Sequence, residues 1–210
     1  MSRLRPLDLP TAQALVAGSD ADLPSSVDIP AVFSPAECAR IVSLKDKLGT
    51  DEARIEGRDN DRAHRRVDGG IRQTDRTHIL PGPAHAWIFD RVAALVEQEN
   101  GRHWRFRLSH LEPLQLLTYP EGGHYDWHTD LGATGLMALR KLSLTVQLSD
   151  GIGYDGGDLE IRVGGRCTVP PRSIGSAVLF PSWQPHRVTP VDRGTRHALV
   201  CWIVGKRSLR

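Results

Sequence analysis

The second half of the chain consists of short runs rich in β-branched and aromatic residues, separated by Gly, Pro and Asp. Runs of this kind, bounded by turn residues, are typical of β-strands. So many short strands favour a sandwich or a barrel, with any helices packed outside it. The predicted strands cover residues 104–109, 114–119, 124–128, 141–149, 158–163, 166–169, 176–180, 186–189 and 195–204.

A capped helix is predicted ahead of this β-rich half. Ser34 can cap it, Pro35 suits its first position, and Glu37 can complete a capping box. The helix is expected to run to about Leu48 and to stop at Gly49, because glycine commonly follows the last turn of a helix.

A second helix is predicted from residue 84 to residue 100, after a Pro-Gly-Pro turn. Between the helices, residues 51–70 are of mixed charge and end in two glycines, so we expect an exposed loop. The absence of an internal repeat favours one domain over residues 1–210. Its expected parts are an irregular segment at 1–26, helical support and strands at 27–103, and a β core at 104–205.

The composition excludes several classes of protein. A formal net charge of +2 over 210 residues gives no global attraction to nucleic acid or anionic lipid. Three cysteines without C-x-x-C spacing suit reduced thiols in the cytoplasm better than a disulfide framework. No stretch is long and apolar enough to predict a signal peptide or a membrane span. A local basic cluster is interpreted as a solvated loop; it comprises Arg62, His64, Arg65 and Arg66.

The densest polar stretch contains two His-x-Asp pairs, His124/Asp126 and His128/Asp130. Residues i and i+2 of a strand share a face, so either pair could present two of the three ligands of a metal-binding facial triad. Spacing alone does not choose between the pairs. A lone histidine here is more often a hydrogen-bonded residue that lines a pocket.

His186 and Arg196 supply the context that these pairs need. His186 follows a turn and begins a predicted strand, and Arg196 opens the apolar run of residues 198–204. An arginine among apolar neighbours costs desolvation unless it meets an anion, and its planar fork suits a carboxylate. The alternatives are a structural ion pair with Asp192 and a strand-end arginine that faces water. With three ligands on one face, a metal keeps positions open for a 2-oxo acid, whose far carboxylate can reach Arg196.

The order of motifs resembles the iron(II)/2-oxoglutarate dioxygenases, in the prolyl 4-hydroxylase-like branch that includes bacterial PKHD-type hydroxylases. The resemblance covers residues 27–205. The motifs that carry it are Tyr119-x5-Tyr125-x2-His128-x-Asp130, Arg140-Lys-Leu-Ser-Leu-Thr-Val-Gln-Leu, Tyr154-Asp-Gly-Gly-Asp-Leu-Glu, Phe180-Pro-Ser, His186-x-Val-x-Pro-Val and Gly194-Thr-Arg196.

The resemblance implies a double-stranded β-helix (jelly-roll, cupin-like) core, which agrees with the strand pattern. It implies that His128, Asp130 and His186 are the iron ligands. Arg196 and Tyr119 are implied to bind 2-oxoglutarate. Further residues are expected to line the pocket or to contact the substrate at its mouth, namely Gln115, Tyr125, Gln147, Trp202, His124 and Asp126.

The implied activity is hydroxylation of an unactivated C–H bond, with Fe(2+), 2-oxoglutarate and O2 and with formation of succinate and CO2; ascorbate binding is a further implied property. The carboxylate at Asp130 favours hydroxylation over halogenation, because halogenating relatives carry a small residue there. The expected substrate is peptidyl proline or another amino-acid-like molecule, with no nucleic-acid or membrane partner. A homodimer is an open alternative.

Two other functions stay open at this point. One is an oxidative nucleic-acid demethylase of the same superfamily, although those relatives carry a second arginine where this chain has Trp202. The other is a non-catalytic cupin-like metal-binding protein, which would not need Arg196. Arg72 and Arg76 could contact a substrate carboxylate, and surface salt bridges explain them equally well.

Overall fold

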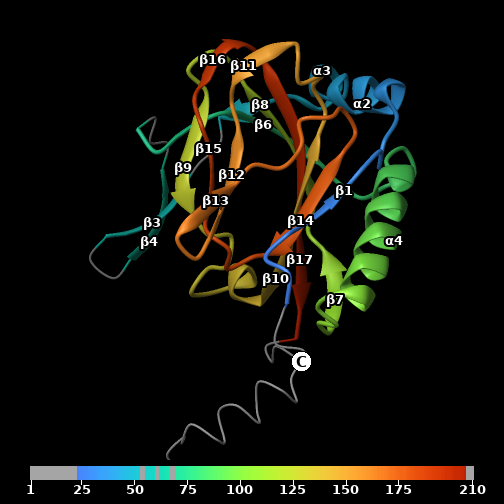
Figure 1. Ribbon diagram of the computed structural model, residues 1–210, viewed down its shortest axis with the longest axis vertical. Coiled ribbons are helices and arrows are strands. Elements are labelled where there is room, and N and C mark those ends of the chain that lie inside the picture. The colour runs from blue at the N-terminus through green and yellow to red at the C-terminus, as the bar shows by residue number, and fades with distance from the viewer. Residues whose placement is uncertain (1–22, 53–54, 60–61, 67–69, 207–210) are drawn as a thin grey trace, which may run out of the picture.

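Two β-sheets face each other, and helices cover the outer side of the larger sheet (Figure 1). The computed structural model describes residues 23–52, 55–59, 62–66 and 70–206, so most of the irregular segment predicted at 1–26 lies outside the described residues. Among the described residues, no helix is both long and apolar enough to cross a membrane.

The larger sheet has eight strands, in the order β1-β14-β10-β17-β8-β6-β2, with β7 also paired to β17. The strand pairings in this sheet are antiparallel throughout the described residues. Its strands are β1 (Val27–Ile29), β2 (Asp51–Glu52), β6 (Asp75–Ile79), β7 (Leu108–Leu111), β8 (Leu114–Tyr119), β10 (Arg140–Gln147), β14 (Ala177–Pro181) and β17 (Arg196–Gly205).

The smaller sheet has five strands, in the order β13-β12-β15-β9-β5. Its strands are β5 (Arg72–Gln73), β9 (His124–His128), β12 (Leu159–Val163), β13 (Arg166–Thr168) and β15 (His186–Val188). Two further pairs are β11 (Tyr154–Gly156) with β16 (Val191–Gly194), and β3 (Ile55–Asp59) with β4 (Arg62–Arg66). Together the sheets form the predicted jelly roll, so the predicted fold class is confirmed.

Strand alternation divides the apolar core into two parts. On β17, Leu199 and Cys201 point to one side and pack with the helices. On the opposite side, Val200 packs against the cluster between the sheets, which includes Leu117 and Phe180. The larger sheet is therefore buried on both faces, and its inner face is the one available to a binding cavity.

The helices on the outer face differ from the prediction in one respect. The Ser34–Glu37 capping box is present, with the Ser34 amide donating to Glu37 Oε2 over 2.8 Å. The single helix predicted from Pro35 is, however, split into α2 (Pro35–Val42) and α3 (Lys45–Leu48). Ser43 ends α2, and its hydroxyl donates to the Arg40 carbonyl over 2.8 Å. The longer helix α4 (Ala86–Arg102) matches the predicted second helix within two residues at each end.

Some strand predictions were wrong or incomplete. Residues 51–70 are not a loop throughout: β2 joins the larger sheet, and β3 and β4 pair as a hairpin that extends away from the sheets (Figure 1). The sequence pattern did not predict this hairpin because residues 55–59 and 62–66 show no alternation of apolar and polar residues. Residues 104–107 of the strand predicted at 104–109 precede β7 and lie outside it; Arg105 there has a positive φ of 55°, which a strand does not adopt. The pattern also missed β1, β5, β6, β11 and β16.

Gly175 offers a test of how tightly the chain packs beside β14. Its φ is +76°, and an added Cβ would lie 1.8 Å from the Phe33 carbonyl oxygen. Gly175→Ala is therefore expected to lower the free energy of unfolding by about 2–4 kcal/mol. The matched control is Gly101→Ala in α4, where an added Cβ meets nothing within 4 Å. Chemical denaturation should show the control unchanged or slightly stabilised; equal losses in both variants would contradict this account.

Candidate metal and co-substrate site

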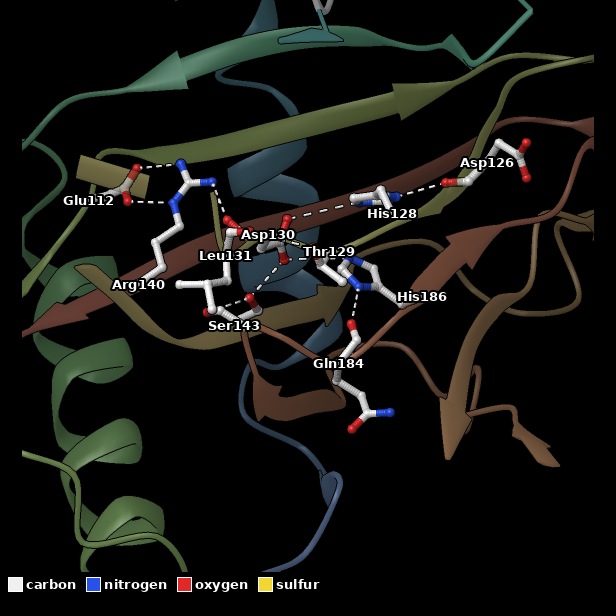
Figure 2. Close-up of polar contacts among 11 residues, drawn as sticks. Glu112, Asp126, His128, Thr129, Asp130, Leu131, Arg140, Ser143, Gln184 and His186 are labelled. Atoms are coloured by element: carbon white, nitrogen blue, oxygen red, sulfur yellow. Dashed lines mark hydrogen bonds and ion pairs between the residues drawn. The ribbon is translucent and has the colours of Figure 1, made fainter. Parts of the chain in front are cut away.

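Neighbouring strands of the smaller sheet bring two histidines together. His128 ends β9 and pairs in register with His186, the first residue of β15. Asp130 follows β9 by two residues, and its backbone N–H donates to the Ser182 carbonyl over 2.9 Å. One ligand atom from each of the three residues lies within 4.8 Å of the others, so this group could hold a metal ion (Figure 2).

Both imidazoles are oriented through their Nδ1 atoms. His128 Nδ1 lies 2.8 Å from the Asp126 carbonyl oxygen, and His186 Nδ1 lies 3.0 Å from the Gln184 carbonyl oxygen. Because a carbonyl oxygen can only accept, each Nδ1 must carry the proton. Each Nε2 then offers its lone pair toward Asp130, at 3.9 Å for His128 and 3.4 Å for His186. This is the tautomer that a metal ligand requires.

Charge states also suit a metal. Burial, followed by the proximity of His186, lowers the pKa of His128 to about 3, so its imidazole is neutral at physiological pH. For Asp130, burial alone would raise the pKa, but His186, His128 and hydrogen bonds from Ser143 and Trp202 outweigh it. Its pKa is therefore lowered, and the group is a carboxylate. The neutral imidazole of His128, the second imidazole from His186 and the Asp130 carboxylate together form a donor set for Fe(II).

Asp130 is held in place by residues to which the sequence pattern had assigned no role. The Ser143 hydroxyl donates to Asp130 Oδ2 over 2.7 Å and lies 3.0 Å from the Ser182 hydroxyl. Arg140 donates to the Asp130 carbonyl oxygen over 3.2 Å. The same guanidinium binds both carboxylate oxygens of Glu112, at 2.6 and 2.7 Å (Figure 2). Arg140 and Ser143 belong to one of the sequence motifs, but their role in holding Asp130 is visible only from their contacts.

A cavity of about 670 Å³ opens between the sheets beside these residues, within the usual range for a small-molecule site. Arg196 lines it, is only 3% exposed, and has its guanidinium carbon 5.3 Å from the centre of the Tyr119 ring. One of its terminal nitrogens is buried and has no hydrogen-bond partner among the described residues. No described carboxylate lies within ion-pair distance of Arg196, so the alternative of a pair with Asp192 is wrong.

Most of the other predicted pocket residues do line this cavity. They are Gln115, Tyr119, Tyr125, Trp202, Arg72 and Arg76. Tyr125 stacks on His128 with ring centres 3.5 Å apart, and Trp202 lies under the Arg140 guanidinium at 4.0 Å. The salt-bridge explanation holds for Arg76, which pairs with Asp51 at 2.5 Å.

His124 and Asp126 are not among the cavity-lining residues, in contrast to the prediction that they share the face of His128. The reason is a β-bulge. His186 pairs with His128 and Val188 pairs with Tyr125, so residues 125–128 of β9 lie opposite residues 186–188 of β15, with one extra residue in β9. The extra residue breaks the alternation, and Tyr125 and His128 both face the cavity. The Asp126 carboxylate is exposed and points away from Asp130 (Figure 2).

Gln147 also lies outside the main cavity. It shares the inner face of β10 with Ser143 but lines a separate, much smaller cavity behind Arg196. There its amide donates to the Tyr154 hydroxyl over 2.8 Å. The prediction that it faces the main pocket was wrong because β10 extends past the end of that pocket.

Known proteins resemble the chain in both sequence and structure. The family model of the 2OG-Fe(II) oxygenase superfamily matches residues 114–204, which include β9, β15 and most of β17. A PKHD-type hydroxylase from Pseudomonas putida F1 is 30% identical over 189 residues, which cover 83% of this chain and 76% of that protein. A PKHD-type hydroxylase from Teredinibacter turnerae is 40% identical over 95 residues, but these cover only 43% of this chain and 42% of that protein.

A solved structure has the same fold. The Pseudomonas putida prolyl-4-hydroxylase superimposes with a TM-score of 0.66 at 20% identity, over 87% of this chain and 93% of that one. The long match to the Pseudomonas putida PKHD-type hydroxylase establishes the family as well. The chain therefore belongs to the 2OG-Fe(II) oxygenase superfamily, as a hydroxylase of the PKHD-type, prolyl 4-hydroxylase-like kind that uses Fe(II), 2-oxoglutarate and O2.

Proposed function

We propose that this chain hydroxylates an unactivated C–H bond of an amino-acid-like substrate and couples the oxidation to decarboxylation of 2-oxoglutarate. In balance, R–H, 2-oxoglutarate and O2 give R–OH, succinate and CO2, with one oxygen atom entering the alcohol and the other entering succinate. The observation that carries the proposal is one cavity that contains both a His-Asp-His donor set and a buried, unpaired arginine.

We assign the metal to His128, Asp130 and His186. Their donor atoms suit Fe(II), and three protein ligands leave positions open for 2-oxoglutarate and O2. Bound iron would supply the activation of O2, while the protein supplies orientation and a shielded pocket. Ser143, Arg140 and the Ser182 carbonyl fix Asp130, so the carboxylate is already positioned when the metal arrives.

We assign the far carboxylate of 2-oxoglutarate to Arg196. A buried guanidinium is costly without an anion, and the fork of an arginine binds a carboxylate through two hydrogen bonds. Tyr119 lies beside Arg196 in register, lines the same cavity and carries a hydroxyl, so we propose it as a second contact. The expected use of ascorbate stays a prediction.

Peptidyl proline is one candidate within the amino-acid-like class, because the Pseudomonas putida neighbour is a prolyl-4-hydroxylase. The alternative of an oxidative demethylase is disfavoured at Trp202. That ring lies under Arg140, and Trp202 contributes, with Ser143, to the lowered pKa of Asp130. The residue that differs from those relatives is thus part of the support for the metal site.

Anaerobic reconstitution tests the proposed function. The protein with Fe(II) and 2-oxoglutarate should develop a visible charge-transfer absorption band, and admission of air should release succinate. His186→Ala should abolish both signals, because the remaining two ligands no longer hold the metal in a facial set. A protein that forms neither the band nor succinate would contradict the proposal.

Arg196→Ala should weaken 2-oxoglutarate binding by roughly 100-fold and leave metal affinity unchanged. The loss is expected because the variant removes the only buried arginine assigned to the co-substrate. The matched control is Arg193→Ala, three residues earlier, where an exposed guanidinium pairs with Asp155. Calorimetric titration of each variant with 2-oxoglutarate, and separately with Mn(II), measures the two affinities. An equal loss of both affinities would indicate a structural arginine.

Ser143→Ala should lower Mn(II) affinity by about 10-fold, because Asp130 would lose the hydroxyl that orients Oδ2. Ser109→Ala serves as the control, since Ser109 lies on β7, donates to the Val204 carbonyl and does not line the cavity. An unchanged Mn(II) affinity in Ser143→Ala, measured by titration, would show that Ser143 does not position the ligand.

A further inference from the structure

Four arginines line the cavity, namely Arg72, Arg76, Arg140 and Arg196. Two of them are neutralised by carboxylates: Arg76 by Asp51 and Arg140 by Glu112. The other two, Arg72 and Arg196, each have a buried nitrogen without a hydrogen-bond partner among the described residues. The proposed function supplies an anion for Arg196 but none for Arg72.

Arg72 is buried in the wall of the cavity. Only 6% of its surface is exposed, and its Nε–H is the buried donor that lacks a partner. Its guanidinium carbon lies 4.5 Å from the centre of the Tyr125 ring, and that ring stacks on His128. Arg72 is therefore separated from the proposed metal ligand by the thickness of one aromatic ring. Burial of a guanidinium at this depth costs free energy that the ring contact only partly offsets.

The opposite wall offers a complementary group. Gln115 Oε1 is buried, faces the same cavity and accepts no hydrogen bond from the described residues. Gln115 precedes Tyr119 by four residues on β8, so it lies about 13 Å along the strand from the Tyr119–Arg196 end. Among the described residues, the cavity thus offers no anion to the buried Arg72 nitrogen and no hydrogen-bond donor to Gln115 Oε1.

We propose that Arg72 binds a free carboxylate of the substrate, and that the substrate is of the α-amino acid class, with its amino group or another N–H directed to Gln115. The inference rests on the proposed function of the same site. A neutral internal peptide bond would leave the Arg72 charge buried and unpaired, whereas a carboxylate neutralises it and fills its donors. The two unpaired arginines then serve different molecules, Arg196 the co-substrate and Arg72 the substrate.

The experiment compares acids with amides. Fe(II)-loaded protein with 2-oxoglutarate is offered the free L-amino acids and, in parallel, their C-terminal carboxamides, and succinate formation is measured. At least one free acid should exceed its carboxamide in kcat/KM by about 10- to 100-fold. Arg72→Gln should remove that preference and leave the dissociation constant of 2-oxoglutarate unchanged.

Arg162→Gln is the matched control. Arg162 also stacks on an aromatic ring, with its guanidinium carbon 4.0 Å from the centre of Trp127, but it is exposed and does not line the cavity. This variant should keep the preference for the acid. Carboxamides, or a prolyl peptide with blocked ends, that turn over as fast as free acids and are insensitive to Arg72→Gln would overturn the assignment while leaving the proposed function intact.

Thermal denaturation decides the case in which no compound supports succinate formation and the proposed function fails. The same acids and carboxamides are added to protein loaded with Mn(II) and 2-oxoglutarate. A ligand that binds only the folded state raises Tm. An acid should raise the Tm of the wild type and of Arg162→Gln but not that of Arg72→Gln. The absence of any acid-selective shift would overturn the proposal.

Discussion

The larger sheet is buried on both faces, and this constraint organises the rest of the molecule. Each of its central strands presents apolar side chains to the helices, and the alternate residues of the same strand point toward the cavity. On β17 the outer positions Leu199, Cys201 and Ile203 are purely apolar, whereas the inner ones begin with Arg196 and end with Trp202. Stability and chemistry are thus assigned to alternate positions of the same strand.

That division explains why charged groups can lie so deep in a small protein. Arg140 is almost fully buried, yet Glu112, the Asp130 carbonyl and the face of Trp202 each satisfy part of it. Asp130 is satisfied in a similar way by the Ser143 hydroxyl, which donates to Oδ2, and by Arg140, which donates to its backbone carbonyl. The surroundings of Arg72 and Arg196 are less complete, because each guanidinium group keeps one buried nitrogen without a hydrogen-bond partner in the described part of the chain. The contrast separates arginines that support the site from arginines that are free to bind a ligand.

The sequence was sufficient to predict the strands with clear apolar alternation and to select the residues of the proposed triad. β9 was predicted with its observed limits, and β10, β14 and β17 were predicted within two residues. It failed where pairing is not accompanied by apolar alternation, as in β3 and β4, and where strands are very short, as in β5. It also missed how Arg140 and Ser143 support Asp130, since partners from different strands leave no spacing signal in one sequence.

The bulge in β9 has a consequence for how such sites change over evolutionary time. His124/Asp126 and His128/Asp130 are nearly the same motif, and a single extra residue separates the pair that faces the cavity from the pair that faces solvent. Successive side chains of a strand point to opposite faces. A one-residue insertion or deletion therefore moves the side chains beyond it from the inner face to the outer face, or the reverse. The chain therefore carries a second His-x-Asp pattern outside the cavity, where the exposed Asp126 carboxylate accepts a hydrogen bond from the Trp127 backbone N–H.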